Sequence, residues 1–173
     1  MMIPIFRKRG RLVKILAGFF GLGYSPVAPG TFGAAGGVGL YFLIQYFSPD
    51  FVPESWEKLR IGYLVFLAIF FLVGVQVATR AEKEWRRRDD HRIVIDEAFS
   101  IFITFLSLPV TPAILIVGFI FNRFFDVVKP FPIRRLEKIS AGWGVMIDDL
   151  MAGIYSRLAL ALLIYGGIIR VSG

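Results

Sequence analysis

Five carboxylates stand within or beside apolar stretches of this sequence: Asp96, Glu97, Asp126, Asp148 and Asp149. A carboxylate in or near a membrane is costly because lipid cannot solvate its charge, so each one is a candidate for a functional site. The chain contains no Cys, and its single histidine, His91, stands in a charged loop where a surface position is expected. A site made only of carboxylate oxygens suits a hard cation, and this composition therefore favours Mg²⁺.

Polar residues continue from these carboxylates at the spacing of helical faces. One expected face carries Glu97, Ser100, Thr104 and Ser107. Three further faces carry Gly118, Asn122, Asp126 and Lys129; Asp149, Gly153 and Ser156; and Gln76, Arg80 and Lys83. Because lipid cannot satisfy polar groups, these faces are expected to meet one another. Glu97 heads its face and Asp96 lies about 100° round the helix, which favours Glu97 for direct contact with an ion.

Ion pairing is the alternative explanation for these acids, with Arg123, Lys129 or Arg134 as partners that fix the topology. Against it, carboxylates that converge from three helices at one depth repel one another unless a cation lies among them. Magnesium beside basic side chains and a glycine-rich loop is the usual apparatus for binding phosphate. We therefore expect a phosphate-handling site.

The glycine-rich segment is "GYSPVAPGTFG", residues 23–33, which leads into an apolar helix. Backbone N–H groups near Gly30 and Thr31 are expected at a helix N-terminus, where anions bind. Ser25 and Thr31 add hydroxyl donors to the same segment. A turn followed by a helix with Thr31 as its N-cap explains the segment equally well, so the phosphate interpretation depends on the acidic cluster lying on the same side of the membrane.

The composition is that of an integral membrane protein. Hydrophobic residues make up 56% of the 173 residues, and the charges, 19% of the chain with a net charge of +7, gather in blocks between long apolar stretches. Such blocks are typical of cytoplasmic membrane loops that attract anionic lipid head groups. Because they form no continuous basic face, a nucleic-acid partner is not expected, and no obligate protein partner is evident.

The order of these stretches predicts an all-α, polytopic membrane helical bundle that forms a single domain over 1–173. An amphipathic helix at 11–20 is expected to lie on the membrane interface. About five membrane segments follow, at 33–47, at 61–79, as a helical hairpin at 92–129 and at 145–169. The hairpin breaks at "PVTP", which leaves helices of 92–108 and 112–129. The basic stretch 80–92 is placed in the cytoplasm, and all five carboxylates then lie near the cytoplasmic ends of their helices.

Four blocks carry a resemblance to a known family: "GYSPVAPGTFG", "VIDEAFSIFITFLSLP", "FNRFFDVVKPFPIRRLE" and "GWGVMIDDLMAGIYS". Together, and in this order, they resemble the bacterial phosphatidylglycerophosphatase A family. The resemblance spans about residues 18 to 160. It implies a Mg²⁺-dependent, all-helical enzyme of the bacterial inner membrane that faces the cytoplasm. It also implies an anionic phospholipid substrate, phosphatidylglycerophosphate, which loses its terminal phosphate to give phosphatidylglycerol.

The resemblance matches the acidic pair Asp96 and Glu97, the segment Phe124 to Pro130 and the pair Asp148 and Asp149 to family motifs, and our hypothesis for the mechanism assigns a role to each candidate residue. The metal would be held or oriented by Asp96, Glu97, Asp126 and Asp149, with Asp148 as a further ligand or the base. The phosphomonoester would be bound by Lys129, Arg123 and Arg134, and by Thr31 with the neighbouring Ser25 and Gly30. Water would attack phosphorus directly, since the chain lacks a phosphate-binding P-loop and a second histidine.

Two other classes of protein remain as alternatives. A small ion- or proton-coupled transporter would also place carboxylates in the membrane. It would hold them near mid-bilayer and show an internal repeat, whereas these acids lie towards one face and no repeat is visible. A non-catalytic scaffold would use the same charges only to fix its topology.

Overall fold

The computed structural model describes residues 4–109 and 111–169, and this part of the chain is helical with no strand. The longer helices are α1 (Pro4–Ala17), α2 (Pro29–Phe47), α3 (Ile61–Trp85), α4 (Ile95–Thr104), α5 (Pro112–Val128) and α7 (Gly142–Tyr165). Shorter ones are the 3₁₀ helices η1 (Phe19–Tyr24) and η2 (Trp56–Lys58) and the single turn α6 (Ile133–Leu136). The all-helical prediction is confirmed for these residues.

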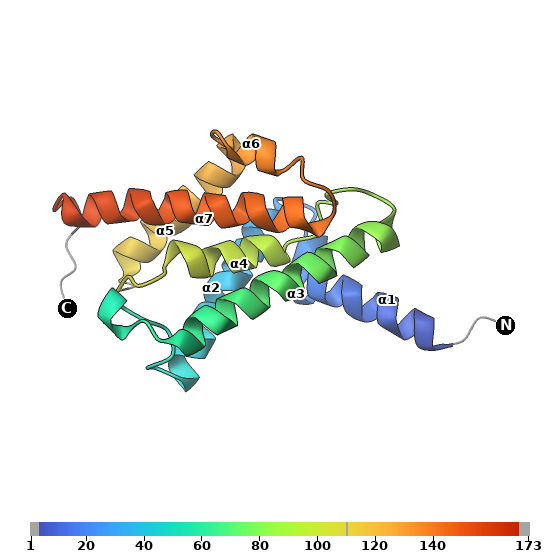
Figure 1. Ribbon diagram of the computed structural model, residues 1–173, viewed down its shortest axis with the longest axis horizontal. Coiled ribbons are helices and arrows are strands. Elements are labelled where there is room, and N and C mark those ends of the chain that lie inside the picture. The colour runs from blue at the N-terminus through green and yellow to red at the C-terminus, as the bar shows by residue number, and fades with distance from the viewer. Residues whose placement is uncertain (1–3, 110, 170–173) are drawn as a thin grey trace.

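Helix α4 lies at the centre of the bundle (Figure 1). It packs against α2, α3, α5 and α7, so it is enclosed on every side. Nine of its ten residues are buried, and Glu97 is the one that keeps partial exposure. A helix that is apolar around most of its surface belongs in an interior, and its position here follows from that pattern.

Glycines on α2 allow its backbone to lie against α4. A Cβ added to Gly37 would be 2.6 Å from the carbonyl oxygen of Ala98, and one added to Gly33 would be 2.5 Å from Cβ of Val94. Both distances are shorter than van der Waals contact, so only glycine fits at this crossing. The small residues at the start of this segment therefore serve close helix packing.

The expected hairpin differs from the structure in its first helix, which spans 95–104 instead of 92–108. The N-terminal limit is set where the Val94 N–H donates to the carbonyl of Ala17, 2.9 Å away, in a bond outside the helix. At the other end, Nε of Arg157 donates a hydrogen bond to the Leu106 carbonyl at 2.6 Å. Ser107 follows with a left-handed backbone conformation, φ of 52°, which does not continue the helix. Contacts with distant residues thus compete with the helix at both ends. The second helix, α5, matches the expected 112–129 closely.

Among the described residues, α3 is the one helix long and apolar enough to cross a membrane by length and composition. Helix α4, with ten residues, rises about 15 Å and is too short for the roughly 30 Å hydrocarbon core. The amphipathic segment expected at 11–20 is α1, which ends at Ala17 and starts earlier in the chain. The number of membrane crossings, about five from the sequence, stays a prediction.

Candidate active site

Three carboxylates converge where the first turn of α4 meets α7. One oxygen each from Asp96, Glu97 and Asp149 can be chosen so that all three lie within 4.8 Å of one another. Opposite ligand oxygens around Mg²⁺ stand about 4.2 Å apart, so this spacing is close to that of ion ligands. The offset of Asp96 around the helix does not separate it from Glu97, and both join the group.

These carboxylates are short of partners, which tests whether they fit a cation. Within the part of the chain that the structure describes, four buried oxygens have no hydrogen-bond donor: Asp96 Oδ1, Glu97 Oε2 and both carboxylate oxygens of Asp149. A buried carboxylate without a donor or cation is strongly disfavoured. The cluster therefore has the donor set and the unsatisfied oxygens that a hard divalent cation requires.

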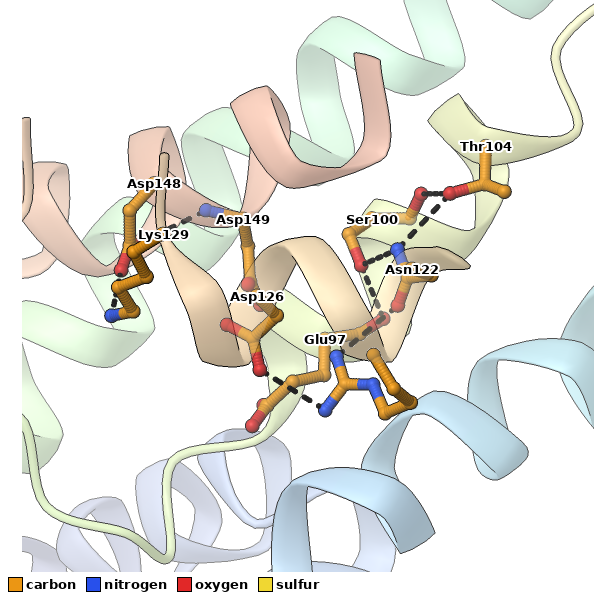
Figure 2. A network of polar contacts seen from close by, with 9 residues as sticks. Glu97, Ser100, Thr104, Asn122, Asp126, Lys129, Asp148 and Asp149 are labelled. Atoms are coloured by element: carbon orange, nitrogen blue, oxygen red, sulfur yellow. Dashed lines mark hydrogen bonds and ion pairs between the residues drawn. The ribbon is translucent and has the colours of Figure 1, made fainter. Parts of the chain in front are cut away.

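The other two acids are paired with cations. Asp126 Oδ2 lies 3.3 Å from Nη1 of Arg123, one turn earlier on α5. Asp148 Oδ2 accepts a hydrogen bond from Lys129 Nζ at 2.7 Å. Asp126 was expected as a fourth metal ligand, but it stands outside the group of three and is seen between Asp149 and Glu97 in Figure 2. The ion-pair explanation thus holds for two of the five carboxylates and leaves three unpaired.

Lys129 is the C-cap of α5 and is held between two acids. Its Nζ lies 2.7 Å from Asp148 Oδ2 and 3.4 Å from Glu137 Oε2. The two carboxylates compensate the positive charge of this partly buried ammonium. The side chain therefore carries a fixed positive charge beside the carboxylate cluster.

Polar faces of α4 and α5 meet as expected. The Asn122 side-chain amide donates to Ser100 Oγ at 2.9 Å and to Thr104 Oγ1 at 3.0 Å, and all three residues are fully buried (Figure 2). The sequence predicted that Asn122 lies on this face but did not assign it to the site. Asn122 stands one turn before Asp126, and its hydrogen bonds to α4 fix the orientation of α5 about its own axis. The face of Gln76, Arg80 and Lys83 is different, since Gln76, Arg80 and Lys83 are exposed.

The glycine-rich segment reaches the cluster at one residue. Gly30 lies against Glu97 Oε1 so closely that a Cβ there would overlap it, and the same Cβ would be 3.0 Å from Arg123 Nη1. Two neighbouring donors already have partners, since the Thr31 N–H donates to the Ala28 carbonyl at 2.9 Å and Ser25 Oγ donates to the Val27 carbonyl at 2.8 Å. Phosphate binding by Ser25, Gly30 and Thr31 stays a prediction. Ala28 occupies the N-cap position of α2, so Thr31 is not the N-cap.

The basic candidates lie at different depths. Arg123 is mostly buried, and its Nη2 donates to Asn122 Oδ1 at 3.1 Å while its Nε has no partner among the described residues. Arg134 is exposed and donates to the Val128 carbonyl at 3.2 Å. Arg123 therefore belongs to the cluster, whereas Arg134 stands outside it. His91 is exposed on the surface, as its charged surroundings indicate.

Comparison with known proteins identifies the family. A family model described as Phosphatidylglycerophosphatase A matches residues 15–164. The chain belongs to the phosphatidylglycerophosphatase A family. The matched range contains all five carboxylates and the four blocks that carry the resemblance in sequence. No solved structure matches the chain.

Curated relatives of the chain cover most of its length. A Haemophilus influenzae protein named phosphatidylglycerophosphatase A is 33% identical over 155 residues, which are 88% of this chain and 89% of the relative. An Escherichia coli protein of the same name is 32% identical over 144 residues, 82% and 77% of the two chains. A Bacteroides thetaiotaomicron protein, provisionally named a phosphatidylinositol-3-phosphatase, is 33% identical over 159 residues, 90% and 96% of the two chains.

Proposed function

We propose that this chain is a lipid phosphatase that hydrolyses the terminal phosphomonoester of phosphatidylglycerophosphate. The products are phosphatidylglycerol and inorganic phosphate, which places the enzyme in phospholipid synthesis. Membership of the phosphatidylglycerophosphatase A family supports the reaction. The observation that carries the proposal is the group of three unpaired carboxylates next to two fixed cations, Arg123 and Lys129.

Mg²⁺ is the proposed cofactor, held by Asp96, Glu97 and Asp149. When bound, it would withdraw charge from the phosphate oxygens and lower the pKa of a coordinated water. The orphaned oxygens of the three carboxylates support this assignment. The burial of the site supports it as well, because three negative charges in the interior are otherwise uncompensated.

The side chains of the protein bind the substrate, hold it in position and accept the proton. Arg123 and Lys129 bind the negatively charged phosphomonoester, and Asp148 holds Lys129 in position through their 2.7 Å hydrogen bond. Gly30 leaves room for the Glu97 carboxylate itself, which a Cβ at this position would overlap. We assign Asp126 as the acceptor of the proton from the attacking water, because its side chain is partly exposed at 21% and hence reachable by water. Water then forms the new P–O bond as the bond to the glycerol oxygen breaks, and the proton taken up by Asp126 passes to the leaving glycerol oxygen.

A membrane position suits this substrate, whose acyl chains stay in the bilayer while the head group enters the site. We propose a multi-pass arrangement in the bacterial inner membrane with α3 as one crossing and the carboxylates towards the cytoplasm. The exposed aliphatic side chains of α3 support contact with lipid; they include Ile61, Leu64, Val65, Ile69, Leu72 and Val73. The cluster of Arg86, Arg87 and Arg88 directly after α3 supports the cytoplasmic assignment.

The transporter alternative is not favoured. The family model of a phosphatase matches most of the chain. In addition, two of the five carboxylates, Asp126 and Asp148, form ion pairs with basic side chains. A non-catalytic scaffold would also contain such ion pairs, because it would use them to fix its topology. A measurement of phosphatase activity therefore distinguishes the enzyme from the scaffold.

Phosphate release by the purified protein in detergent tests the proposal. We expect release from phosphatidylglycerophosphate with Mg²⁺ and its loss when a chelator is added. Release that is insensitive to chelator would remove the metal from the mechanism, and absence of release under every condition would refute the phosphatase. Phosphatidylinositol 3-phosphate serves as the second substrate, because one relative is named for that activity. A higher kcat/KM on that lipid would overturn the choice of substrate.

A further inference from the structure

A hollow lies on the surface where α5 turns into α6, over residues 128–135, with a volume of about 450 Å³. Three cationic residues contribute to its wall, Lys129, Arg134 and Arg135, although the surface that faces the hollow is almost wholly apolar. The remaining lining is apolar, with Phe131 exposed at 72% and Val128 at 41%. This combination of positive charge and exposed apolar surface is complementary to the head-group region of an anionic lipid.

The turn that forms the hollow is held in shape by contacts with the bundle. Ile133 is fully buried, and the Tyr155 hydroxyl of α7 donates to the Phe131 carbonyl at 2.9 Å. Arg134 donates to the Val128 carbonyl at 3.2 Å, and the Arg135 guanidinium lies 5.0 Å from the centre of the Phe131 ring. The two arginines are therefore positioned at the hollow by contacts within it, and each keeps further N–H donors for an anion.

Lys129 joins this hollow to the carboxylate cluster. It lines the hollow, and its Nζ contacts Asp148, the residue before Asp149. A lipid that fills the hollow next to Arg134 and Arg135 would therefore have its neighbouring polar group close to Lys129 and the cluster.

We propose that this hollow holds the apolar part of the lipid substrate next to its phosphodiester, with Arg134 and Arg135 as the cationic partners of the diester. The proposal rests on the proposed function, since phosphatidylglycerophosphate carries a phosphodiester one glycerol away from the phosphomonoester that is cleaved. Val128 and Phe131 contact the apolar part next to that diester. Arg134 was expected from the sequence at the phosphomonoester, and Arg135 was not singled out. The hollow assigns both to the other phosphate.

Binding of short-chain phosphatidylglycerol tests the subsite, because this lipid has the phosphodiester and lacks the phosphomonoester. The full-length protein in detergent is compared with the double variant Arg134→Gln/Arg135→Gln by equilibrium titration. The control is Arg86→Gln/Arg87→Gln, which removes the same charge from two exposed arginines after α3. We expect Kd to rise about tenfold in the first variant, the size of one lost charge-assisted hydrogen bond, and less than twofold in the control.

Three outcomes would overturn the subsite. One is unchanged binding in Arg134→Gln/Arg135→Gln, and another is an equal loss in both double variants, which would indicate a general effect of surface charge. The third is displacement of the lipid by inorganic phosphate as effectively as by glycerophosphoglycerol, which would indicate an unselective anion site. Phosphatidylglycerol is not hydrolysed, so selective loss of its binding supports the subsite even where phosphate release fails. Failure of the two proposals is thereby distinguished.

Discussion

Gly30 of α2 and Glu97 of α4 are in such close contact that any side chain on Gly30 would occupy the position of the Glu97 carboxylate. The glycine-rich segment and the acidic cluster, more than sixty residues apart, thus form one site. The contact also explains why the segment has glycine where a helix would ordinarily favour alanine. Helix α2 contributes space to the site, and α4 contributes charge.

Gly30→Ala is expected to reduce activity with little change in stability. The atom that a Cβ would meet is the end of a flexible side chain, so Glu97 moves instead of the backbone. We expect kcat/KM to fall about tenfold or more, while the melting temperature in detergent stays within a few degrees. Gly39→Ala on the same helix is the control, since a Cβ there has nothing within 4 Å. Equal activity of the two variants would contradict this account of Gly30.

Gly37→Ala is expected to show the opposite behaviour. Its Cβ would be 2.6 Å from the carbonyl oxygen and 2.8 Å from Cα of Ala98, and this backbone cannot give way by a side-chain rotation. The two helices must separate, so we expect a loss of about 1–3 kcal/mol in the free energy of unfolding. Denaturation in detergent measures it against Gly39→Ala. A variant as stable as the control would show that the α2–α4 crossing is looser than described.

Asp149→Asn and Asp126→Asn are expected to separate metal binding from proton transfer. Asp149→Asn removes a carboxylate from the unpaired group, so activity should fall on the order of a thousandfold and the Mg²⁺ concentration for half-maximal rate should rise. Asp126→Asn should lower kcat by about a hundredfold without that rise. Asp50→Asn is the control, because Asp50 is exposed and lies more than forty residues before the acidic cluster in the sequence. A raised Mg²⁺ requirement in Asp126→Asn would return Asp126 to the ligand set.

Asn122→Ala is expected to destabilise the bundle. It removes the donor to Ser100 and Thr104 at 2.9 and 3.0 Å and leaves two buried hydroxyls with fewer partners. We expect a loss of about 2 kcal/mol in the free energy of unfolding. Gln76→Ala removes an exposed amide from α3 and should be neutral. Equal stability of both variants would show that the polar contact between α4 and α5 contributes nothing.

Asp90 gives a pH dependence away from the site. Arg92 donates to both carboxylate oxygens, Nε to Oδ1 at 2.7 Å and Nη2 to Oδ2 at 2.8 Å, and these bonds lower the pKa of Asp90 to about 2. The depressed pKa means that the folded state binds its proton less tightly than the unfolded state, whose pKa is about 3.9. The resulting stability is present above about pH 4 and is lost as the pH falls towards 2.

The comparison of Asp90→Asn with the wild type checks that sign. We expect the variant to be less stable by about 1 kcal/mol at pH 6, with the difference shrinking as the pH is lowered from 4 to 2. The measurement is the free energy of unfolding of both proteins at each pH. A difference that is constant over this range would show that the carboxylate charge does not contribute.

Much of this architecture is predictable from the sequence, because apolar runs and polar spacing are local signals. They place α3, α5 and α7 and bring the faces of Glu97 and Asn122 together. Interactions between distant residues were not accessible in this way. Arg157 donates a hydrogen bond to the carbonyl of Leu106, fifty-one residues earlier, just after the end of α4. Lys129 forms its hydrogen bond with Asp148, nineteen residues later, and not with Asp149. Which acids are paired, and hence which are left for a cation, depends on those contacts.

The enclosure of α4 separates the site from the thickness of the bilayer. Helices that face lipid tilt or shift when the hydrocarbon layer is thicker or thinner than their apolar length. Helix α4 is ten residues long with nine of them buried by its neighbours, so in the proposed membrane arrangement it has no lipid-facing surface to match. Asp96 and Glu97 therefore lie on a helix whose position does not depend directly on the thickness of the bilayer. An enzyme built this way keeps one active-site geometry while the acyl chains of the surrounding membrane lengthen or shorten.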